Sequence, residues 1–209
     1  MHCLILFILQ LSLIHSKELK PMFTEQNPNN QQKTIILGAG CFWCVEAIFE
    51  QLKGVEKVES GYCGGESINP TYEEVCSGNS KHIEVCKITY RPSVISLHDL
   101  LSIFWQIHDP TTPNRQGNDV GEQYQSVIFY NDEFELNLAQ EMKDSLNKNK
   151  VFKQPVITEI KSIKPFYKAE NYHQNYYNNN TYQPYCKFVI LPKLEKFKKS
   201  YKEQLKSKQ

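Results

Sequence analysis

The chain has 209 residues, of which 40% are hydrophobic and 12% aromatic, and its formal net charge is +1. This length and composition allow one sizeable core, so we expect a single domain with tails. A net charge close to zero creates no overall field toward nucleic acid or a strongly charged surface, and we expect no nucleic-acid partner.

The N-terminal 16 residues form an apolar leader. Residues 4–14 are apolar except for Gln10 and Ser12, but a bilayer span needs roughly 20 apolar residues, so we expect no stable membrane insertion. We interpret residues 1–16 as a signal peptide, which would send the protein to the secretory pathway or outside the cell. No Lys or Arg precedes the apolar run, which is unusual for a signal peptide. The alternatives are therefore an uncleaved N-terminus that associates with membranes or an extension without a role, and the alternative location is the cytoplasm.

Residues 17–32 are polar and without periodicity, which predicts a flexible lead-in before a single domain at 33–209. That domain begins with the β-branched apolar run 34–37, a buried strand that ends at the glycine turn 38–40. Apolar residues then recur at helical spacing through 45–52, and Gly54 ends this helix. Residues 55–62 and 83–90 predict two further strands.

Residues 96–99, Ser-Leu-His-Asp, resemble a capping box in which Asp replaces Glu, and they predict a helix that ends before Asp109. We expect a fourth strand at 126–130, a helix near 133–147 and a short edge strand at 156–160. The order β-α-β-β-α-β predicts an α/β (α+β) two-layer sandwich with a ferredoxin-like split β-α-β core and a mixed or antiparallel sheet.

The C-terminal stretch 193–209 carries seven Lys and two Glu, and its apolar residues recur at helical spacing. We expect a C-terminal helix that docks on the body and presents a solvated lysine face.

Among the cysteines, Cys41 is the one whose position indicates a reactive thiol. Seven cysteines are present, and in an exported chain six could form disulfides, but a core of this size needs none, so we expect most to be core residues. Gly38 and Gly40 allow a sharp turn that places Cys41 in the first turn of the helix. Free N–H groups and the helix dipole favour a thiolate there, so the sequence predicts a lowered pKa for Cys41.

Phe42 and Trp43 follow the cysteine directly. Both cannot lie on the buried face of the same helix, so at least one is expected to wall an apolar pocket beside Cys41 for a small hydrophobic group. The alternative is that both fill the core.

Further motifs follow along the chain. After Gly40-Cys-Phe-Trp43 and Glu46-Ala47 come Gly61-Tyr-Cys-Gly-Gly65, Asn69-Pro-Thr-Tyr-Glu-Glu-Val-Cys-Ser-Gly78, His82-Ile-Glu-Val85, Gly117-Asn-Asp-Val-Gly-Glu-Gln-Tyr-Gln-Ser126 and Tyr172-His-Gln174. Each block alone is weak, but the six in this order resemble the peptide methionine sulfoxide reductase A family. Cys63, Glu122 and Gln125 depart from the family pattern, and the last two bear on recognition of the peptide around the substrate.

The resemblance implies an enzyme that reduces methionine S-sulfoxide, free or in oxidised proteins and peptides, to methionine through a sulfenic acid on Cys41. Glu84 is then the acid that protonates the sulfoxide oxygen, and it should share a strand face with Cys86 and Ile88. Burial there would raise the pKa of Glu84. A surface glutamate on an edge strand is the alternative.

The resemblance also implies the groups that hold the substrate. The polar ones around the sulfoxide oxygen would be Tyr72, Asp119 and Tyr124, beside the apolar wall of Phe42 and Trp43.

A second thiol would close a disulfide with the sulfenic acid. We favour Cys186, because a tail cysteine after a mobile polar segment can reach the pocket. Cys44 is the rival, although a disulfide between helical positions i and i+3 would strain the first turn. The resemblance implies thioredoxin or another dithiol as the reductant, and we expect no bound cofactor, no metal and a monomer.

Two other classes of protein remain open at this point. A Cys-x-x-Cys pair such as Cys41 and Cys44 occurs in zinc-binding modules, but no second ligand pair has the usual spacing. The same pair occurs in thioredoxin-like disulfide exchangers, in which Phe42 and Trp43 would crowd a partner protein.

Overall fold

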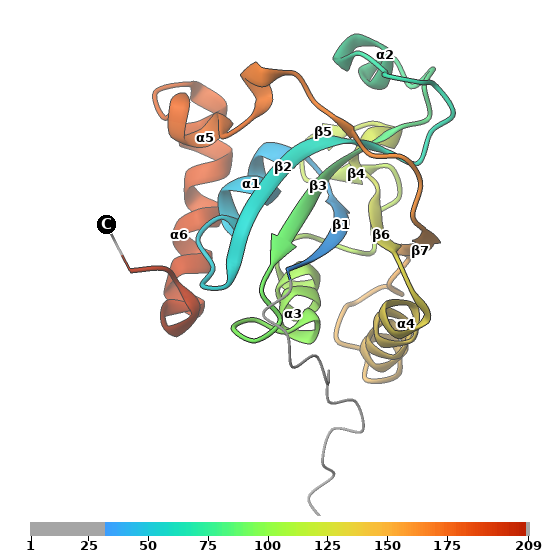
Figure 1. Ribbon diagram of the computed structural model, residues 1–209, viewed down its shortest axis with the longest axis vertical. Helices are drawn as coiled ribbons and strands as arrows, with labels where there is room; N and C mark the ends of the chain where they lie inside the picture. Colours follow the sequence, from blue (N-terminus) through green and yellow to red (C-terminus); the bar gives the residue numbers. More distant parts are fainter. Residues whose placement is uncertain (1–31, 208–209) are drawn as a thin grey trace, which may run out of the picture.

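The computed structural model describes residues 32–207. The predicted leader (1–16) and all but the last residue of the predicted lead-in (17–32) lie outside the described residues. The described part has a mixed α/β fold, in which helices pack against a six-stranded mixed sheet with the strand order β7-β6-β1-β3-β2-β8 (Figure 1).

Four central strands form the antiparallel middle of the sheet, in the order β6-β1-β3-β2. They confirm the four strands predicted before residue 131. Within β3, Cys86 is paired with Leu37 of β1 and also with Ser60 of β2, so β3 is an interior strand. The strands are β1 (Lys33–Ala39), β2 (Val55–Cys63), β3 (Ile83–Tyr90) and β6 (Ser126–Tyr130).

Two short strands form the edges of the sheet. β7 (Glu159–Ser162) is parallel to β6, and β8 (Tyr167–Lys168) is antiparallel to β2. The prediction of an edge strand at 156–160 is wrong in its position. The N–H of Val156 donates to Asn147 Oδ1, near the end of α4 (Glu133–Lys148), and that of Ile157 donates to the Pro110 carbonyl in a loop, so the ladder starts only at residue 159.

Six α-helices occur in the described residues. α3 begins with the predicted capping box, because Ser96 Oγ accepts from the Asp99 N–H and Asp99 Oδ2 accepts from the Ser96 N–H. The helices are α1 (Phe42–Phe49), α2 (Tyr72–Cys76), α3 (Leu97–Ile107), α4 (Glu133–Lys148), α5 (Tyr176–Asn179) and α6 (Leu191–Ser200).

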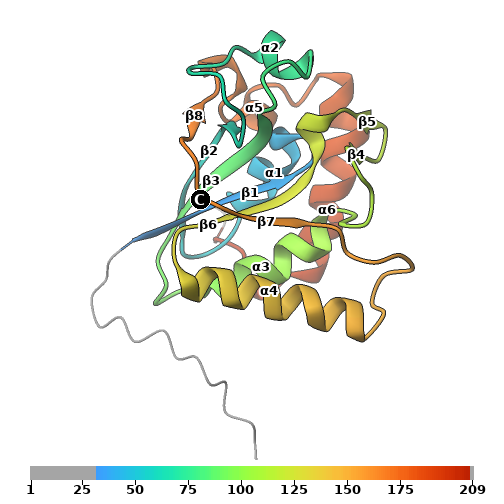
Figure 2. The ribbon, with the colours of Figure 1, turned by 90° about the vertical axis from the view of Figure 1, so that its right-hand side faces the viewer.

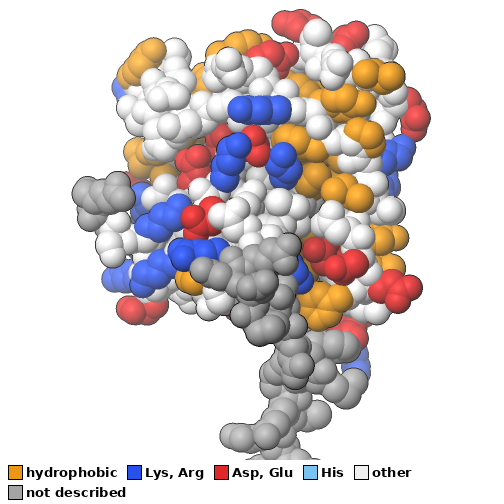
Figure 3. All heavy atoms as spheres, in the orientation of Figure 1, with side chains coloured by type: hydrophobic (Ala, Val, Ile, Leu, Met, Phe, Trp, Pro, Cys, Tyr) orange, Lys and Arg blue, Asp and Glu red, His pale blue; other side chains and the backbone are white. Residues whose placement is uncertain are grey.

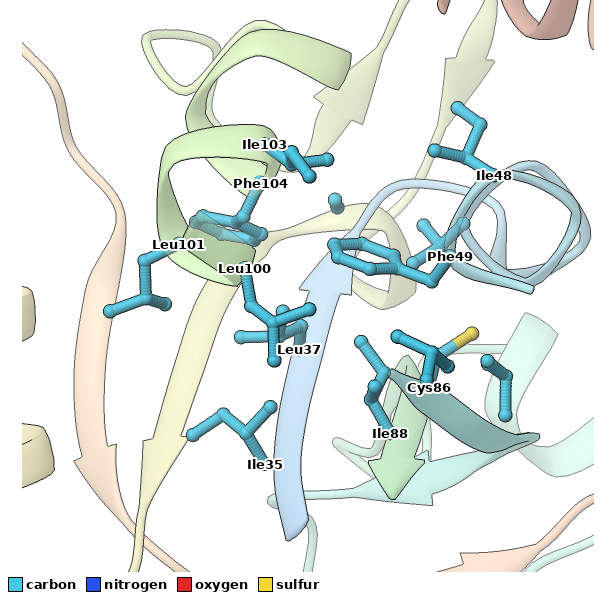
Figure 4. Close-up of a cluster of buried hydrophobic side chains, with 14 of the residues drawn as sticks. Ile35, Leu37, Ile48, Phe49, Cys86, Ile88, Leu100, Leu101, Ile103 and Phe104 are labelled. Atoms are coloured by element: carbon cyan, nitrogen blue, oxygen red, sulfur yellow. The ribbon is translucent and has the colours of Figure 1, made fainter. Parts of the chain in front are cut away.

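The main core lies between the sheet and the helices α1 and α3 (Figure 4). Successive strand residues point to opposite faces, so Ile35 and Leu37 of β1 face these helices, where they meet Phe49 and Phe104. Ile36 joins a smaller cluster that Phe166 partly covers.

The C-terminal segment, here residues 185–207, packs on the body as predicted and contacts α1 (Figure 2). Its helix α6 ends at Ser200, short of the helical spacing that continues to Leu205 in the sequence, because a 3₁₀ turn follows. Leu194 and Phe197 of α6 are buried in the main core, and Leu205 forms a bridge with Leu52. On the face seen in Figure 3, basic and acidic side chains are interspersed, in keeping with the small net charge. No helix within residues 32–207 has the length and apolar character needed to cross a membrane.

Candidate active site

A pocket of about 210 Å³ opens where β1 turns into α1. Segments from distant parts of the chain meet there: the β1–α1 junction, α2, β3, the hairpin strand β5 (Asp119–Val120), the 3₁₀ turn η1 (Glu122–Tyr124) and the start of the C-terminal segment. Every site residue predicted from the sequence lines it except Cys186, and Tyr185 is added. The lining residues are Cys41, Phe42, Trp43, Tyr72, Glu84, Asp119, Tyr124 and Tyr185.

The turn into the pocket requires glycine at position 40. Gly40 has φ +85, and a Cβ there would lie 2.6 Å from the side chain of Gln116. Cys41 follows as the N-cap of α1, with φ −53 and ψ 120, and its carbonyl accepts from the Cys44 N–H at 3.1 Å. Cys41 therefore lies just before the first helical turn, one position earlier than predicted.

Burial has the largest effect on the pKa of the Cys41 thiol. The residue is only 7% exposed, and burial raises its pKa well above the usual value, with a hydrogen bond to Cys44 adding to the rise. The expected lowering of the pKa is therefore wrong, because the cost of desolvating a thiolate at this buried position is the largest effect. The partner thiol has the opposite shift: the hydrogen bond from Cys41 lowers the pKa of Cys44.

Glu84 is almost fully buried, and Oε2 accepts from the Phe42 N–H at 3.0 Å. Burial raises its pKa to about 8. Cys86 and Ile88, two and four residues along the same strand, lie in the main core, as the strand alternation predicted. At neutral pH the carboxyl is mostly protonated, so it can donate a proton into the pocket.

Three tyrosines supply further hydroxyl groups. Burial raises the pKa of Tyr72 and of Tyr124, so both stay protonated and can donate hydrogen bonds. The Tyr185 hydroxyl donates to Asp119 Oδ2 at 2.7 Å. The polar groups expected around a sulfoxide oxygen are thus brought into one pocket with Glu84.

Trp43 forms an apolar wall of the pocket. It is half-buried, stacks on Tyr176 with ring centroids 3.6 Å apart, and its Nε1 donates to His173 Nδ1 at 3.2 Å. Phe42 is fully buried and packs into the core, so the two aromatics are not both core residues. The sequence analysis assigned no role to His173 or Tyr185, although His173 lies in the motif Tyr172-His-Gln174 and Tyr185 directly precedes Cys186.

Cys186 lies in a cluster of sulfur atoms and apolar side chains behind the pocket. This cluster, here called the sulfur cluster, consists of Cys41, Cys44, Ala47, Cys186 and Ile190. Cys186 is fully buried in the π-helical turn η3 (Cys186–Ile190), so it is not on a mobile tail as expected.

The six cysteines within residues 32–207 are all free thiols, and Cys63 and Cys86 are buried core residues, as predicted for most of them. In this described part, no three or more His, Cys, Asp or Glu side chains are grouped so that they could hold a metal ion.

Comparison with known proteins identifies the family. The family model for peptide methionine sulfoxide reductase matches residues 33–206. The chain belongs to this family. The reductase is similar to peptide methionine sulfoxide reductase MsrA of Trichodesmium erythraeum, with 52% identity over 172 residues, 82% of this chain and 97% of the relative. The MsrA of Chromobacterium violaceum is 51% identical over 82% of this chain and 98% of its own length.

A solved structure agrees with this assignment. The crystal structure of Mxr1 from Saccharomyces cerevisiae in reduced form matches with a TM-score of 0.68 and 34% identity, covering 75% of this chain and 90% of that chain. The protein is therefore a peptide-methionine (S)-S-oxide reductase, which reduces methionine sulfoxide to methionine. Family membership sets aside the zinc-binding module and the disulfide exchanger as its function.

Proposed function

We propose that this reductase uses Cys41 as the nucleophile and Glu84 as the proton donor. The observation that carries the proposal is that a buried thiol and a buried carboxyl with a pKa of about 8 line the same small pocket. Oxygen leaves sulfur readily only when it gains a proton, and a carboxyl that is protonated at neutral pH can supply it.

The pocket walls support a definite orientation of the substrate. The methyl and thioether part packs against Phe42 and Trp43, while the sulfoxide oxygen faces Glu84. Tyr72 and Tyr124 donate hydrogen bonds to the oxygen as negative charge develops on it.

Asp119 takes part through Tyr185, whose hydroxyl it holds by accepting a hydrogen bond. This contact positions the phenol ring at the wall of the pocket.

The first step forms a bond between the Cys41 sulfur and the sulfoxide sulfur. Glu84 gives its proton to the sulfoxide oxygen, and the resulting carboxylate takes the proton of the Cys41 thiol. The S–O bond of the substrate and the new S–S bond then break as the hydroxyl passes to the Cys41 sulfur. Methionine leaves with its sulfur reduced by two electrons, and Cys41 is left as a sulfenic acid, whose sulfur is oxidised by two electrons. The burial of both groups supports this exchange, because each is protonated at neutral pH.

Regeneration requires a second thiol and an external dithiol. We infer that the sulfenic acid condenses with a thiol of the sulfur cluster, either Cys186, favoured by the sequence, or Cys44. Thioredoxin or another dithiol then reduces the disulfide; the family and the thiol chemistry support this reductant, and no bound cofactor is required.

We also infer a ferredoxin-like two-layer sandwich, because the chain order β1-α1-β2-β3-α3-β6 and the sheet order β6-β1-β3-β2 are those of a split β-α-β core. Residues 33–209 then form one catalytic domain that acts as a monomer.

The experiment is a turnover assay with a methionine S-sulfoxide peptide, thioredoxin, thioredoxin reductase and NADPH. Cys41→Ser should abolish methionine formation, whereas Cys63→Ser, a buried cysteine outside the pocket, should retain it. Full activity of Cys41→Ser would refute the proposal.

A further inference from the structure

Cys44 differs from the other thiols of the sulfur cluster in its electrostatic surroundings. The Nζ of Lys193, on α6, donates to Cys44 Sγ over 3.9 Å, and the Tyr185 hydroxyl lies 3.9 Å from the same sulfur. An ammonium group at this distance favours a thiolate. The hydrogen bond from Cys41 and then the charge of Lys193 lower the pKa of Cys44, although burial opposes them.

The backbone lets Cys41 and Cys44 meet without distortion of a regular helix. Strain in an i, i+3 disulfide is expected where both residues lie inside a helical turn. Cys41 is instead the N-cap, with a non-helical ψ of 120, and Cys44 is the third residue of α1. The side chain of an N-cap residue faces the second and third residues of the helix, and the Cys41 and Cys44 thiols lie in the same cluster, close enough to shift each other's pKa.

Cys186 is less suited than Cys44 to attack a sulfenic acid on Cys41. It is fully buried in η3, and burial raises its pKa, with the charge of Cys44 adding to the rise. A neutral thiol is a poor nucleophile.

We propose that Cys44 is the thiol that resolves the Cys41 sulfenic acid, and that Lys193 is a positioning residue that holds Cys44 ready for this step. The Cys44 sulfur attacks the Cys41 sulfur, an S–S bond forms and the S–O bond of the sulfenic acid breaks. The proton given up by Cys44 and the departing hydroxyl leave as water, and no further oxidant is required. The proposal rests on the proposed function, which supplies the sulfenic acid.

The first test is a single turnover without reductant, with excess methionine sulfoxide peptide. Methionine is counted, disulfides are mapped by mass spectrometry, and the sulfenic acid is trapped with dimedone. Wild type and Cys186→Ser should both form the Cys41–Cys44 disulfide at the same rate. Cys44→Ser should release about one methionine per enzyme and keep a sulfenic acid that dimedone traps.

A Cys41–Cys186 disulfide in wild type with Cys44 free would overturn the proposal, and so would disulfide closure at the wild-type rate in Cys44→Ser. Failure of the proposed function has a different signature, because Cys41→Ser would then still produce methionine and no product would be linked to residue 41.

The second test addresses Lys193. In the single-turnover assay, Lys193→Met should slow disulfide closure by roughly tenfold at neutral pH. The rate should recover as the pH rises, because the Cys44 thiol then ionises without the help of the Lys193 ammonium. Lys193→Arg should restore most of the rate. Lys196→Met, which removes an exposed lysine from the same helix, should close the disulfide like wild type.

A purely structural role of Lys193 would not make the defect depend on pH. Closure by Lys193→Met at the wild-type rate at every pH would refute the role assigned to this residue.

Discussion

Glu84 and Cys41 are two acids that burial keeps protonated, and the proposed passage of a proton between them depends on that shared environment. Burial is the largest cause of the raised pKa of each, although the Phe42 N–H donates to Glu84 and favours its carboxylate. A protonated carboxyl beside a neutral thiol has no charge to repel a polar substrate. Neither proton is transferred until a sulfoxide oxygen is bound that can accept one of them.

Loss of the Glu84 proton should therefore slow the chemical step. Because the pKa of Glu84 is about 8, the rate of methionine formation in a single turnover should fall as the pH rises through that value. Glu84→Gln, which keeps the side-chain shape, should lose roughly 10²- to 10⁴-fold in this rate and no longer show the fall with pH. A rate for Glu84→Gln within threefold of wild type would contradict the assignment.

The same residue predicts a pH dependence of stability. Glu84 is protonated in the folded protein up to a pH of about 8 but ionises near 4.5 when unfolded. The native state thus binds an extra proton between these values, and the free energy of unfolding should fall as the pH rises across this window. In urea unfolding, the free energy of unfolding of Glu84→Gln should rise relative to that of wild type by up to about 4 kcal/mol at pH 8 and by little at pH 4.5.

Exposed Glu73→Gln serves as the control for this measurement and should change the stability by no more than a few tenths of a kcal/mol at either pH. An equal stability difference between Glu84→Gln and wild type at both pH values would show that the carboxyl is not held protonated.

Short elements hold Trp43, the apolar wall of the pocket, in place. The 3₁₀ turn η2 (Asn171–His173) follows Glu170, whose carboxylate accepts from the Tyr62 hydroxyl at 2.8 Å and from the Tyr72 N–H at 3.0 Å. His173 then accepts from Trp43 Nε1, and its ring contacts Tyr72 with centroids 4.6 Å apart. A turn too short to be stable alone thus links β2, α2 and α1 through side chains.

His173→Phe should loosen this wall. The substitution keeps a ring but removes the acceptor for Trp43 Nε1, and a hydrogen bond of this kind is worth about 1 kcal/mol. We expect KM for a methionine sulfoxide peptide to rise by roughly fivefold, with a smaller change in kcat, because Glu84 and Cys41 are untouched. Tyr172→Phe, at an exposed neighbour, is the matched control. An unchanged KM in His173→Phe would show that Trp43 needs no such anchor.

The C-terminal segment belongs to both the core and the site. Leu194 and Phe197 of α6 are buried against the body, and the same helix brings Lys193 to Cys44. Tyr185, just before η3, lines the pocket. Docking of this segment therefore contributes to stability and completes the site.

Phe197→Ala should destabilise the protein by about 3 kcal/mol or more, because the side chain is 4% exposed and its removal leaves a cavity under α6. Phe188→Ala removes the same atoms from a position that is 80% exposed and should change the free energy of unfolding by less than about 0.5 kcal/mol. Denaturant unfolding of the two variants compares them directly. Equal losses would mean that α6 is not part of the cooperative core.

Local patterns in the sequence determined much of this protein. The apolar runs, the glycine turn before Cys41 and the capping box of α3 depend on neighbours a few residues away, and the four central strands and α3 appear where these patterns predicted them. The same blocks of residues also led to the family. The edge strand is an exception, because the Val156 N–H donates to a side chain near the end of α4 and not to a neighbouring strand.

The protonation state of the thiols and the contacts that hold the pocket in place depend on the complete fold. The contacts of Trp43 with His173 and of Cys44 with Lys193 join residues 130 and 149 positions apart, and no local period records such a pair. The raised pKa of Cys41 likewise follows from burial by the whole fold. A helix start can be read from the sequence, but desolvation depends on everything that packs over it, and here its effect exceeds the local preference for a thiolate.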